Sequence, residues 1–556
     1  MITSLLSRTD FDSYEDFYKN YAFNVPENFN FGFDIVDAIT AKDPNRRAIV
    51  WCNDAGAERN FTMGEVTRLS NQAANYFASL GIRKGDFVML VLKRRWQYWA
   101  AVVGLHKLGA VAIPATALLT KKDIIYRCKA ADIKMIVAVN EPGIRAAIEA
   151  AAQEVTIPLL ALVEKNPTDA SNPTDQIWLD FDAGMASASS HFPRPADAAC
   201  GKDMMLLYFT SGTTGMPKMV ALNHLYPLGH IATARYWQNC QPGGLHFTVA
   251  ETGWAKTAWG KLYGQWIAGS AVMVYDFNQF KAADLLGVVA KYGVTTFCAP
   301  PTMYRYFIKE NLKAYDFSKL RYCVVAGEPL NPEVFEQFKA ATGHELREGY
   351  GQTELTVALG TFPWMKPKPG SMGRPSPGYD IDLVDENGNS CEVGEEGQIV
   401  VRTDKRQPFG MFDGYYRDPE LTNKVWHDGV YYTGDTAWRD AEGYYWFVGR
   451  ADDVIKSSGY RIGPFEVESA LVEHKAVLEC AVTGVPDEER GAIVKASVVL
   501  AKGWEPSDEL KKELQAHVKT VTAPYKYPRI IEFVTELPKT ISGKIRRVEI
   551  RAKDKA

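Results

Sequence analysis

A run of hydroxyl, glycine and lysine residues follows an apolar segment near the middle of the chain. The apolar segment is Met204–Phe209, and Tyr208–Val220 reads YFTSGTTGMPKMV. Glycines let backbone amides turn toward an anion without a clash at Cβ, while hydroxyls and an ammonium add donors and positive charge. This combination suits a triphosphate, although it lacks the P-loop pattern G-x-x-x-x-G-K-[ST]. We therefore predict phosphate binding by Thr210, Ser211, Gly212, Thr213, Thr214, Gly215 and Lys218.

Further motifs follow this loop in a fixed order. They are Gly327-Glu328-Pro329, Gly349–Glu354 (GYGQTE), Tyr432–Asp435 (YTGD), Gly449–Gly463 (GRADDVIKSSGYRIG) and Pro538–Lys544 (PKTISGK). The ordered set resembles the adenylate-forming family, which includes acyl-CoA synthetases, adenylation domains of peptide synthetases and firefly-type luciferases. The resemblance spans nearly the whole chain and is closest to the medium-chain acyl-CoA synthetases. It implies that ATP is bound by the loop together with Gly327, Glu328, Pro329, Glu348, Gly349, Tyr350, Gln352, Thr353, Asp435 and Arg450.

The residue types fit the roles that the resemblance implies. Asp435 can accept hydrogen bonds from both ribose hydroxyls, and Arg450 can donate to the same sugar. Glu354 offers a hard oxygen ligand of the kind that Mg²⁺ uses together with phosphate oxygens. Thr353 offers a hydroxyl to the α-phosphate, and Lys544 can bridge the substrate carboxylate and that phosphate.

The resemblance implies a reaction in two steps. A carboxylate attacks the α-phosphate of MgATP and releases pyrophosphate, and the thiol of coenzyme A then attacks the acyl-adenylate. The C-terminal domain rotates between the steps about a hinge that corresponds to Asp452. Rotation withdraws Lys544 and brings Gly459 to the pantetheine channel, and Arg461 resembles the family's phosphate-facing arginine.

The identity of the acid depends on a smaller group of residues. Acetyl-CoA synthetases have a tryptophan before Gln-Thr-Glu, where this chain has Gly351, so the pocket has room for several methylenes. The segment Thr252–Gly260 looks like that of the medium-chain synthetases. We expect the acyl group to contact Trp237, Lys256, Trp259, Cys298, Gly327 and Gly351. The predicted acid is short and branched or of medium length, and aromatic acids remain open.

Three other functions compete with this interpretation. A free-standing adenylation enzyme would load an acid onto a separate carrier protein. A luciferase-type enzyme would oxygenate the adenylate, and a non-enzymatic relative would only bind nucleotide. The last requires a broken motif, whereas this chain retains Lys218, Glu354, Asp435, Arg450 and Lys544.

Composition excludes several classes of partner. The formal net charge of -4 over 556 residues gives no support for broad binding to nucleic acid or to anionic membranes. The eight cysteines are scattered without zinc-finger or C-x-x-C spacing, which favours a reducing cytoplasm. We expect no signal peptide, no membrane span and no binding of nucleic acid. The oligomeric state cannot be predicted.

Alternating elements must position these residues. Strand patterns at Asp86–Leu92, Val111–Pro114 and Lys134–Val139 surround a helical pattern at Trp96–Leu108. This order predicts an α/β fold with helix-covered parallel sheets. Residues 166–199 are rich in Ser, Asp, Asn, Ala and Pro, and we expect surface loops there.

The chain is too long for one hydrophobic core. After residue 450 the pattern changes to short strands, at Glu479–Thr483 and Ala496–Leu500, and an amphipathic helix at Asp508–Val521. We predict a large N-terminal AMP-binding domain over residues 1–450 and a small, mobile C-terminal α+β domain over residues 451–556.

Overall fold

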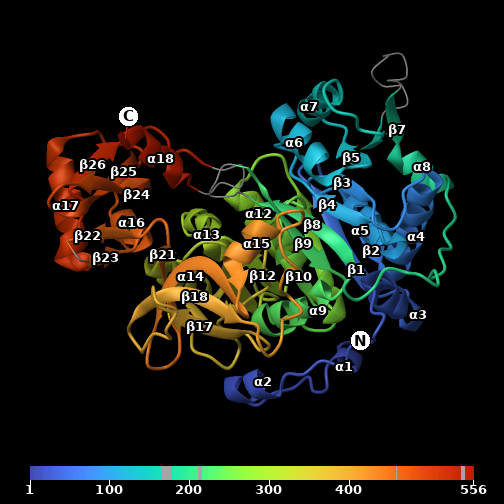
Figure 1. Ribbon diagram of the computed structural model, residues 1–556, viewed down its shortest axis with the longest axis horizontal. Helices are drawn as coiled ribbons and strands as arrows, with labels where there is room; N and C mark the ends of the chain where they lie inside the picture. The colour runs from blue at the N-terminus through green and yellow to red at the C-terminus, as the bar shows by residue number, and fades with distance from the viewer. Residues whose placement is uncertain (166–176, 211–215, 459, 540–544, 556) are drawn as a thin grey trace.

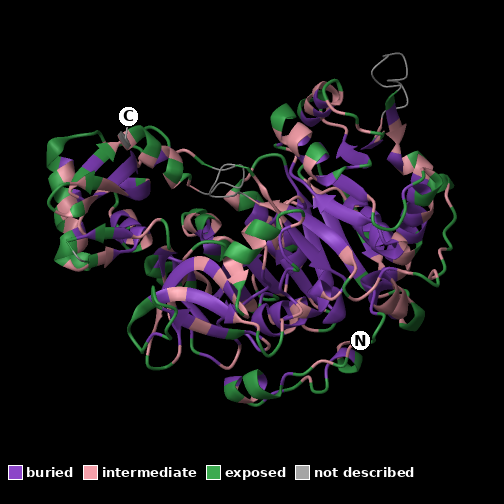
Figure 2. Cartoon of the chain, viewed as in Figure 1, coloured by how far each residue is buried: buried purple, intermediate pink, exposed green. Residues whose placement is uncertain are grey.

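The computed structural model describes residues 1–165, 177–210, 216–458, 460–539 and 545–555. Two large sheets with helices around them form most of the molecule, and a smaller α+β unit formed by the C-terminal residues packs beside them (Figure 1). Burial is concentrated in the strands of the two large sheets (Figure 2). The predicted α/β class and the small C-terminal unit are therefore confirmed.

The first sheet is parallel except at one edge, where β8 and β9 are antiparallel. Its strands run in the order β7 (Trp178–Asp180), β6 (Leu159–Val163), β5 (Met135–Val139), β3 (Phe87–Val91), β4 (Val111–Pro114), β8 (Met204–Thr210) and β9 (Lys218–Asn223). Strands β3 and β5 are buried at every position, as expected for parallel strands covered on both faces. The strands predicted from apolar runs agree with β3, β4 and β5 to within one residue at each end.

The helices of the first sheet are α4 (Met63–Ser79), α5 (Gln97–Leu108), α6 (Lys121–Ala131), α7 (Pro142–Ala152) and α8 (Phe181–Ser187). Helix α4 packs closely on α5, because Gly104 leaves no Cβ between them: one would lie 2.9 Å from the carbonyl oxygen of Ser70. The loops expected over residues 166–199 are partly wrong, since β7 and α8 lie there. Trp178, Phe181 and Met185 are buried, so their packing stabilises short elements that composition alone does not reveal.

The second sheet joins a parallel half to an antiparallel half. Its strands run in the order β17 (Asp380–Val384), β18 (Glu396–Arg402), β20 (Val430–Arg439), β21 (Tyr445–Arg450), β16 (Ser371–Pro375), β15 (Leu359–Gly360), β14 (Leu346–Tyr350), β13 (Tyr322–Ala326), β12 (Thr296–Ala299), β10 (Leu245–Thr248), β11 (Ala271–Asp276), β1 (Arg47–Asn53) and β2 (Glu58–Thr62), with β19 (Trp426–His427) beside β20. Parallel pairing extends from β14 to β1.

Short helices connect these strands. They are α9 (Tyr226–Ile231), η4 (Ala232–Trp237), α10 (Lys256–Gly260), α11 (Tyr263–Ile267), α12 (Ala282–Lys291), α13 (Pro301–Phe307), η5 (Leu312–Ala314), α14 (Pro332–Thr342) and α15 (Pro419–Val425). An N-terminal arm precedes the sheets and consists of α1 (Ile2–Leu5), α2 (Tyr14–Asn20), η1 (Gly32–Asp37) and α3 (Ala38–Lys42). The arm is hydrogen-bonded to the large unit at Pro375 and at Tyr236. No helix in the described ranges has both the length and the apolar character needed to span a lipid bilayer.

The C-terminal unit has its own buried core, around residues such as Val467, Leu471 and Leu514. It consists of β22 (Ile455–Ser457), β23 (Tyr460–Ile462), α16 (Pro464–Val472), β24 (Val477–Asp487), β25 (Gly491–Leu500), α17 (Asp508–Val521), η6 (Pro524–Lys526), β26 (Ile530–Phe533) and α18 (Arg547–Lys555). Helix α17 matches its predicted range, and the two predicted strands form parts of β24 and β25. A turn at residues 451–453 follows β21.

Candidate active site

The edge of the first sheet carries the start and the end of the predicted phosphate loop. Thr210 ends β8 and pairs with Lys218, which begins β9, so the two residues that flank the predicted loop are strand partners. The residues Ser211, Gly212, Thr213, Thr214, Gly215, Gly459 and Lys544 lie outside the described part of the chain. What we predict for them stays a prediction.

Lys218 and Glu354 both contact one tyrosine. The ammonium of Lys218 is 5.1 Å from the centre of the Tyr415 ring. The hydroxyl of Tyr415 donates a hydrogen bond of 2.9 Å to Oε1 of Glu354. Burial lowers the pKa of Lys218, and the negative charge of Glu354 opposes that shift. A cation and a carboxylate therefore stand close together beside the predicted phosphate loop.

The carboxylate of Asp435 is buried and accepts hydrogen bonds from three side chains. Oδ2 accepts from the Tyr350 hydroxyl and from Nε2 of Gln352, both at 2.6 Å. Oδ1 accepts from Nη1 of Arg450 at 3.1 Å, because β20 and β21 pair Asp435 directly with Arg450. Residues from β14, from the turn that follows it, and from two antiparallel strands thus meet at one carboxylate.

Tyr431 connects this group to the one around Glu354. Its hydroxyl donates to Oε1 of Gln352 at 2.9 Å. Burial raises the pKa of Tyr431, and the charges of Glu354 and Asp435 raise it further. Tyr415 and Tyr431 were missed by the sequence analysis, because each lies more than sixty residues from its partner. An aromatic residue in FDGYYRDPE or in VYYTGD carries no local sign of such a contact.

Glu348 makes its hydrogen bonds to other parts of the chain. Its buried carboxylate accepts hydrogen bonds from the backbone N–H of Leu330, at 3.2 Å, and of Gly370, at 2.6 Å. Burial raises the pKa of Glu348 to about 8. In these contacts Glu348 holds the loop that contains Gly327, Glu328 and Pro329 in place. Its predicted contact with nucleotide stays a prediction.

Lys256 and Gly327 approach each other closely. Nζ of Lys256 donates to the carbonyl oxygen of Ala326 at 2.5 Å. Gly327 has a φ of +108°, and a Cβ there would lie 2.9 Å from Nζ of Lys256. The positive φ therefore favours glycine at 327, whereas the flexible end of Lys256 could move away from a Cβ. Glu328 lies at the surface, where it accepts from the backbone N–H of Thr302 at 3.0 Å.

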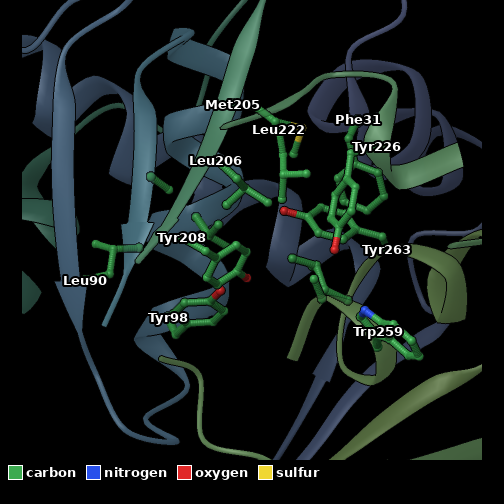
Figure 3. Close-up of a cluster of buried hydrophobic side chains, with 14 of the residues drawn as sticks. Phe31, Leu90, Tyr98, Met205, Leu206, Tyr208, Leu222, Tyr226, Trp259 and Tyr263 are labelled. Atoms are coloured by element: carbon green, nitrogen blue, oxygen red, sulfur yellow. The ribbon is translucent and has the colours of Figure 1, made fainter. Parts of the chain in front are cut away.

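The two tryptophans expected at the acyl group pack against the GYGQTE segment. A Cβ at Gly349 would lie 2.4 Å from the Trp237 ring, and a Cβ at Gly351 would lie 2.6 Å from the Trp259 ring. The Trp237 and Trp259 rings meet edge to face at 6.0 Å. Figure 3 shows Trp259 at the border of a buried cluster that includes Tyr226 and Tyr263. Space beside Gly351 is therefore filled by Trp259.

Cys298 lies on β12, buried at the carboxyl end of the parallel strands. Burial raises the pKa of its thiol, and the positive charge of Lys256 opposes this shift. The predicted contact of Cys298 and Lys256 with the acyl group stays a prediction.

Arg461 and Asp452 lie outside the group at Asp435. Nη1 of Arg461 is 3.0 Å from Glu386, and its Nε is 3.9 Å from Glu396. Arg461 lines an open cleft of about 540 Å³ together with Tyr460, Tyr525 and three carboxylates. Asp452 is half exposed and lies 3.8 Å from Nε of Arg450. In this arrangement of the chain Arg461 does not contact the predicted nucleotide residues that the structure describes.

Comparison with family models gives two matches. The AMP-binding enzyme model matches residues 36–416, and the AMP-binding enzyme C-terminal domain model matches residues 466–544. The phosphate loop and Glu354 fall in the first match, and Lys544 is the last residue of the second.

Several curated proteins are similar along nearly the whole chain. The mouse acyl-coenzyme A synthetase ACSM3, mitochondrial, is 39% identical, over 98% of this chain and 94% of its own length. The rat ACSM4, mitochondrial, and the human ACSM5, mitochondrial, are each 42% identical, over 95% of this chain and 91% of their own lengths. These relatives are named mitochondrial, whereas the cytoplasm is our prediction for this chain.

Solved structures share the fold. The anthranilate CoA ligase AuaEII in complex with anthranoyl-AMP has a TM-score of 0.86 at 29% identity, over 96% of this chain and 98% of that one. A benzoate CoA ligase from Burkholderia xenovorans LB400 has a TM-score of 0.81 at 27% identity, over 94% of this chain and 100% of that one.

The Brucella canis acyl-CoA synthetase has a TM-score of 0.74 at 32% identity, over 98% of this chain and 99% of that one. The two family matches contain the predicted motifs from Tyr208–Val220 onward, except those between residues 417 and 465, and the relatives match over nearly the whole chain. The chain therefore belongs to the AMP-binding enzyme family and, within it, to the AMP-forming acyl-CoA synthetases, which are acid–thiol ligases.

Proposed function

We propose that the protein converts a short branched or medium-chain carboxylic acid, ATP and coenzyme A to acyl-CoA, AMP and pyrophosphate. The observation that carries the proposal is the pair of connected groups around Asp435 and Glu354. In the first group, Asp435 offers acceptors and Arg450 a cation for a sugar. In the second, Lys218 offers a cation and Glu354 a carboxylate next to the predicted phosphate loop.

In the first step an oxygen of the substrate carboxylate attacks the α-phosphorus of ATP. The bond from that phosphorus to the oxygen of pyrophosphate breaks, and pyrophosphate leaves with the electron pair. Lys218 and the loop after Thr210 hold the phosphates, while Asp435 and Arg450 hold the ribose. Thr353 donates to the α-phosphate, and Lys544 bridges both anions, since a fixed cation stabilises charge that develops between them. Gly327–Pro329 and Tyr350 contact the adenine.

Glu354 is suited to hold Mg²⁺. Among the described residues, no group of three or more His, Cys, Asp or Glu side chains is arranged to hold a metal ion by itself. A single carboxylate fits Mg²⁺, which takes its other ligands from phosphate oxygens and water. When bound, the ion neutralises phosphate charge. The chain contributes Glu354, oriented by Tyr415.

In the second step the thiol sulfur of coenzyme A attacks the acyl carbon, and AMP leaves with the carboxylate oxygen that formed the adenylate. The thiol proton passes to solvent. The C-terminal domain, which we place at residues 451–556 after an N-terminal domain of residues 1–450, rotates about Asp452 between the steps. Its rotation separates Arg461 from Glu386 and brings Gly459 toward the pantetheine arm.

The acid is limited by the tryptophans. Trp259 and Trp237 occupy the space beside Gly351 and Gly349. We propose that a short branched or medium acyl chain lies against these rings, bounded by Lys256, Cys298 and Gly327. An aromatic acid is the second candidate, because the similar solved structures include an anthranilate and a benzoate CoA ligase. Loading of a separate carrier protein is the remaining alternative.

The proposal is tested by incubating the protein with ATP, Mg²⁺, coenzyme A and single acids from acetate to decanoate, with branched and aromatic members. We expect equal amounts of AMP and thioester, with the highest kcat/KM for a branched or medium acid. Formation of AMP without a CoA thioester would favour carrier loading. No acid-dependent AMP would contradict the proposal.

A variant of Lys544 separates the two steps. We expect Lys544→Ala to lower adenylation about 10²-fold to 10³-fold, because one preorganised charge contact is lost. Thioester formation from a supplied acyl-adenylate should remain close to that of the wild type. Pyrophosphate exchange measures the first step. Equal losses in both steps would contradict the assigned role.

A further inference from the structure

Tyr415 is held in place by backbone contacts along β9. Residues 413–416 run antiparallel to the strand: Ala221 donates to the carbonyl oxygen of Gly414 at 3.1 Å, and Tyr416 donates to that of Met219 at 2.8 Å. The N–H of Tyr415 donates to Oγ1 of Thr422 at 2.9 Å. Since Lys218 begins β9, the position of Tyr415 relative to Lys218 is set by strand pairing.

The same segment also fixes Glu354. The N–H of Phe412 donates to the carbonyl oxygen of Glu354 at 2.9 Å, and the Tyr415 hydroxyl donates to its side chain. Glu354 is therefore held at both its backbone and its carboxylate by residues 412–415. The Tyr415 ring itself is buried and packs edge to face on Phe412, with the ring centres 5.1 Å apart.

One aromatic side chain thus contacts both charged groups. Its face lies beneath the ammonium of Lys218, a favourable cation–π arrangement, and its hydroxyl donates to the carboxylate of Glu354. A donor on Oε1 fixes the rotation of the carboxylate and leaves Oε2 for another ligand. The hydrogen bond between Tyr415 and Glu354 depends on the fold and not on neighbouring positions in the sequence, because the two residues are 61 positions apart.

We propose that Tyr415 is a positioning residue that sets Lys218 and Glu354 at the spacing required by a metal–triphosphate complex. The inference rests on the proposed function of these two residues. The ring holds the cation that meets the phosphates, and the hydroxyl holds the carboxylate that meets the metal ion. The two contributions can be removed separately.

The test measures binding of ATP with and without a metal ion, with no acid or coenzyme A present. Mn²⁺ serves as the probe, since free Mn²⁺ is read by electron paramagnetic resonance, and metal-free ATP binding is measured by calorimetry in EDTA. Tyr415→Phe removes only the hydroxyl. It should weaken Mn²⁺–ATP binding about tenfold, as expected for a hydrogen bond to a charged group, and leave metal-free ATP binding unchanged.

Tyr415→Leu removes the ring as well. It should weaken metal-free ATP binding several-fold, because Lys218 loses its aromatic partner. The matched control is Tyr416→Phe, which changes the neighbouring tyrosine and should bind both forms of ATP like the wild type. Glu354→Gln completes a double-mutant cycle: with the carboxylate gone, Tyr415→Phe should have no further effect on Mn²⁺–ATP binding.

Additive effects of Tyr415→Phe and Glu354→Gln would overturn the inference. So would a Tyr415→Phe variant that binds Mn²⁺–ATP like the wild type, or one that loses both forms of ATP equally with a lower Tm. Failure of the proposed function is recognised separately, because the wild type would then bind Mn²⁺–ATP without forming AMP from any acid.

Discussion

At the scale of single residues, side chains of the candidate site are held by hydrogen bonds between buried or partly buried polar groups. Asp435 is the clearest case, since its carboxylate accepts from Tyr350, Gln352 and Arg450. The sequence motifs pointed to GYGQTE, YTGD and the segment that begins at Gly449, and the fold brings residues of all three together at Asp435. They could not indicate that Tyr350 and Gln352 both donate to Asp435, because that contact depends on how β14 and β20 lie in the fold.

Asp435→Asn should impair both ATP binding and stability. An amide places a donor where Tyr350 and Gln352 also donate, which leaves a buried group unsatisfied at a cost of about 1–3 kcal/mol. We expect KM for ATP to rise about tenfold or more and Tm to fall. Asp404→Asn, at an exposed position, is the control. An unchanged KM would contradict a role for Asp435 at the sugar.

Glu348→Gln tests a pH dependence. Burial raises the pKa of Glu348 from 4.5 to about 8, so between these values the folded protein holds a proton that the unfolded chain releases. The resulting stabilisation is complete below about pH 4.5 and is lost as the pH rises through about 8. The difference in Tm, wild type minus variant, should therefore decrease from pH 5 to pH 8. A difference that is constant or increases with pH would show that the carboxylate titrates lower.

At the scale of elements, long apolar runs were predictable and packed short elements were not. The runs at β3, β4 and β5 are buried on both faces, so their apolar pattern is continuous and visible. Strand β7 and helix α8 each depend on one or two buried side chains, Trp178 or Phe181 and Met185, within a polar segment. The packing of Trp259, on helix α10, against Gly351 in the GYGQTE segment could not be predicted either.

Trp259, on α10, should set the length of acid that the enzyme accepts. Trp259→Leu removes the ring that fills the space beside Gly351. We expect longer acids to gain about fourfold in kcat/KM for each methylene buried in the new space, relative to propionate in the same protein. The ratio of hexanoate to propionate cancels any general loss of activity. A ratio equal to that of the wild type would place the acyl chain elsewhere.

Gly351 itself offers no such room, because a Cβ there would also lie 2.2 Å from the carbonyl oxygen of Thr356. Substitution at 351 would therefore move backbone rather than only fill a pocket. The space that the sequence suggests at 351 is therefore already occupied by Trp259 and by the backbone of Thr356.

At the scale of the whole molecule, a partly buried ion cluster connects the turn after β21 with the C-terminal helix. Arg547 donates to both carboxylate oxygens of Glu468, at 2.7 and 2.8 Å, and lies 3.6 Å from Asp453. Arg551 also pairs with Asp453. Ile545, two residues before Arg547, pairs with Lys539. The cluster therefore lies next to the paired residues that flank the segment containing Lys544.

Arg547→Gln should therefore affect the first half-reaction more than the second. Loss of Arg547 leaves Glu468 and Asp453 partly unpaired and loosens the connection between α18 and the turn. Pyrophosphate exchange should fall at least tenfold more than thioester formation from supplied acyl-adenylate, and Arg547→Lys should restore part of it. Arg546→Gln is the matched control, since Arg546 is exposed and pairs only with Glu549 among the described contacts. Equal losses in both half-reactions, together with a lower Tm, would contradict this prediction and would show that the cluster only stabilises the fold.

If the acid is activated as an acyl-adenylate, one of its carboxyl oxygens must end in AMP, and isotope labelling can follow that atom. The enzyme is supplied with ATP, Mg²⁺, coenzyme A and an acid whose two carboxyl oxygens are both ¹⁸O. The attacking oxygen becomes bound to the α-phosphorus and stays there when the thiol displaces AMP. Mass spectrometry should therefore find one ¹⁸O atom in each AMP and none in pyrophosphate. Unlabelled AMP, or label in inorganic phosphate with ADP as the other product, would contradict the account.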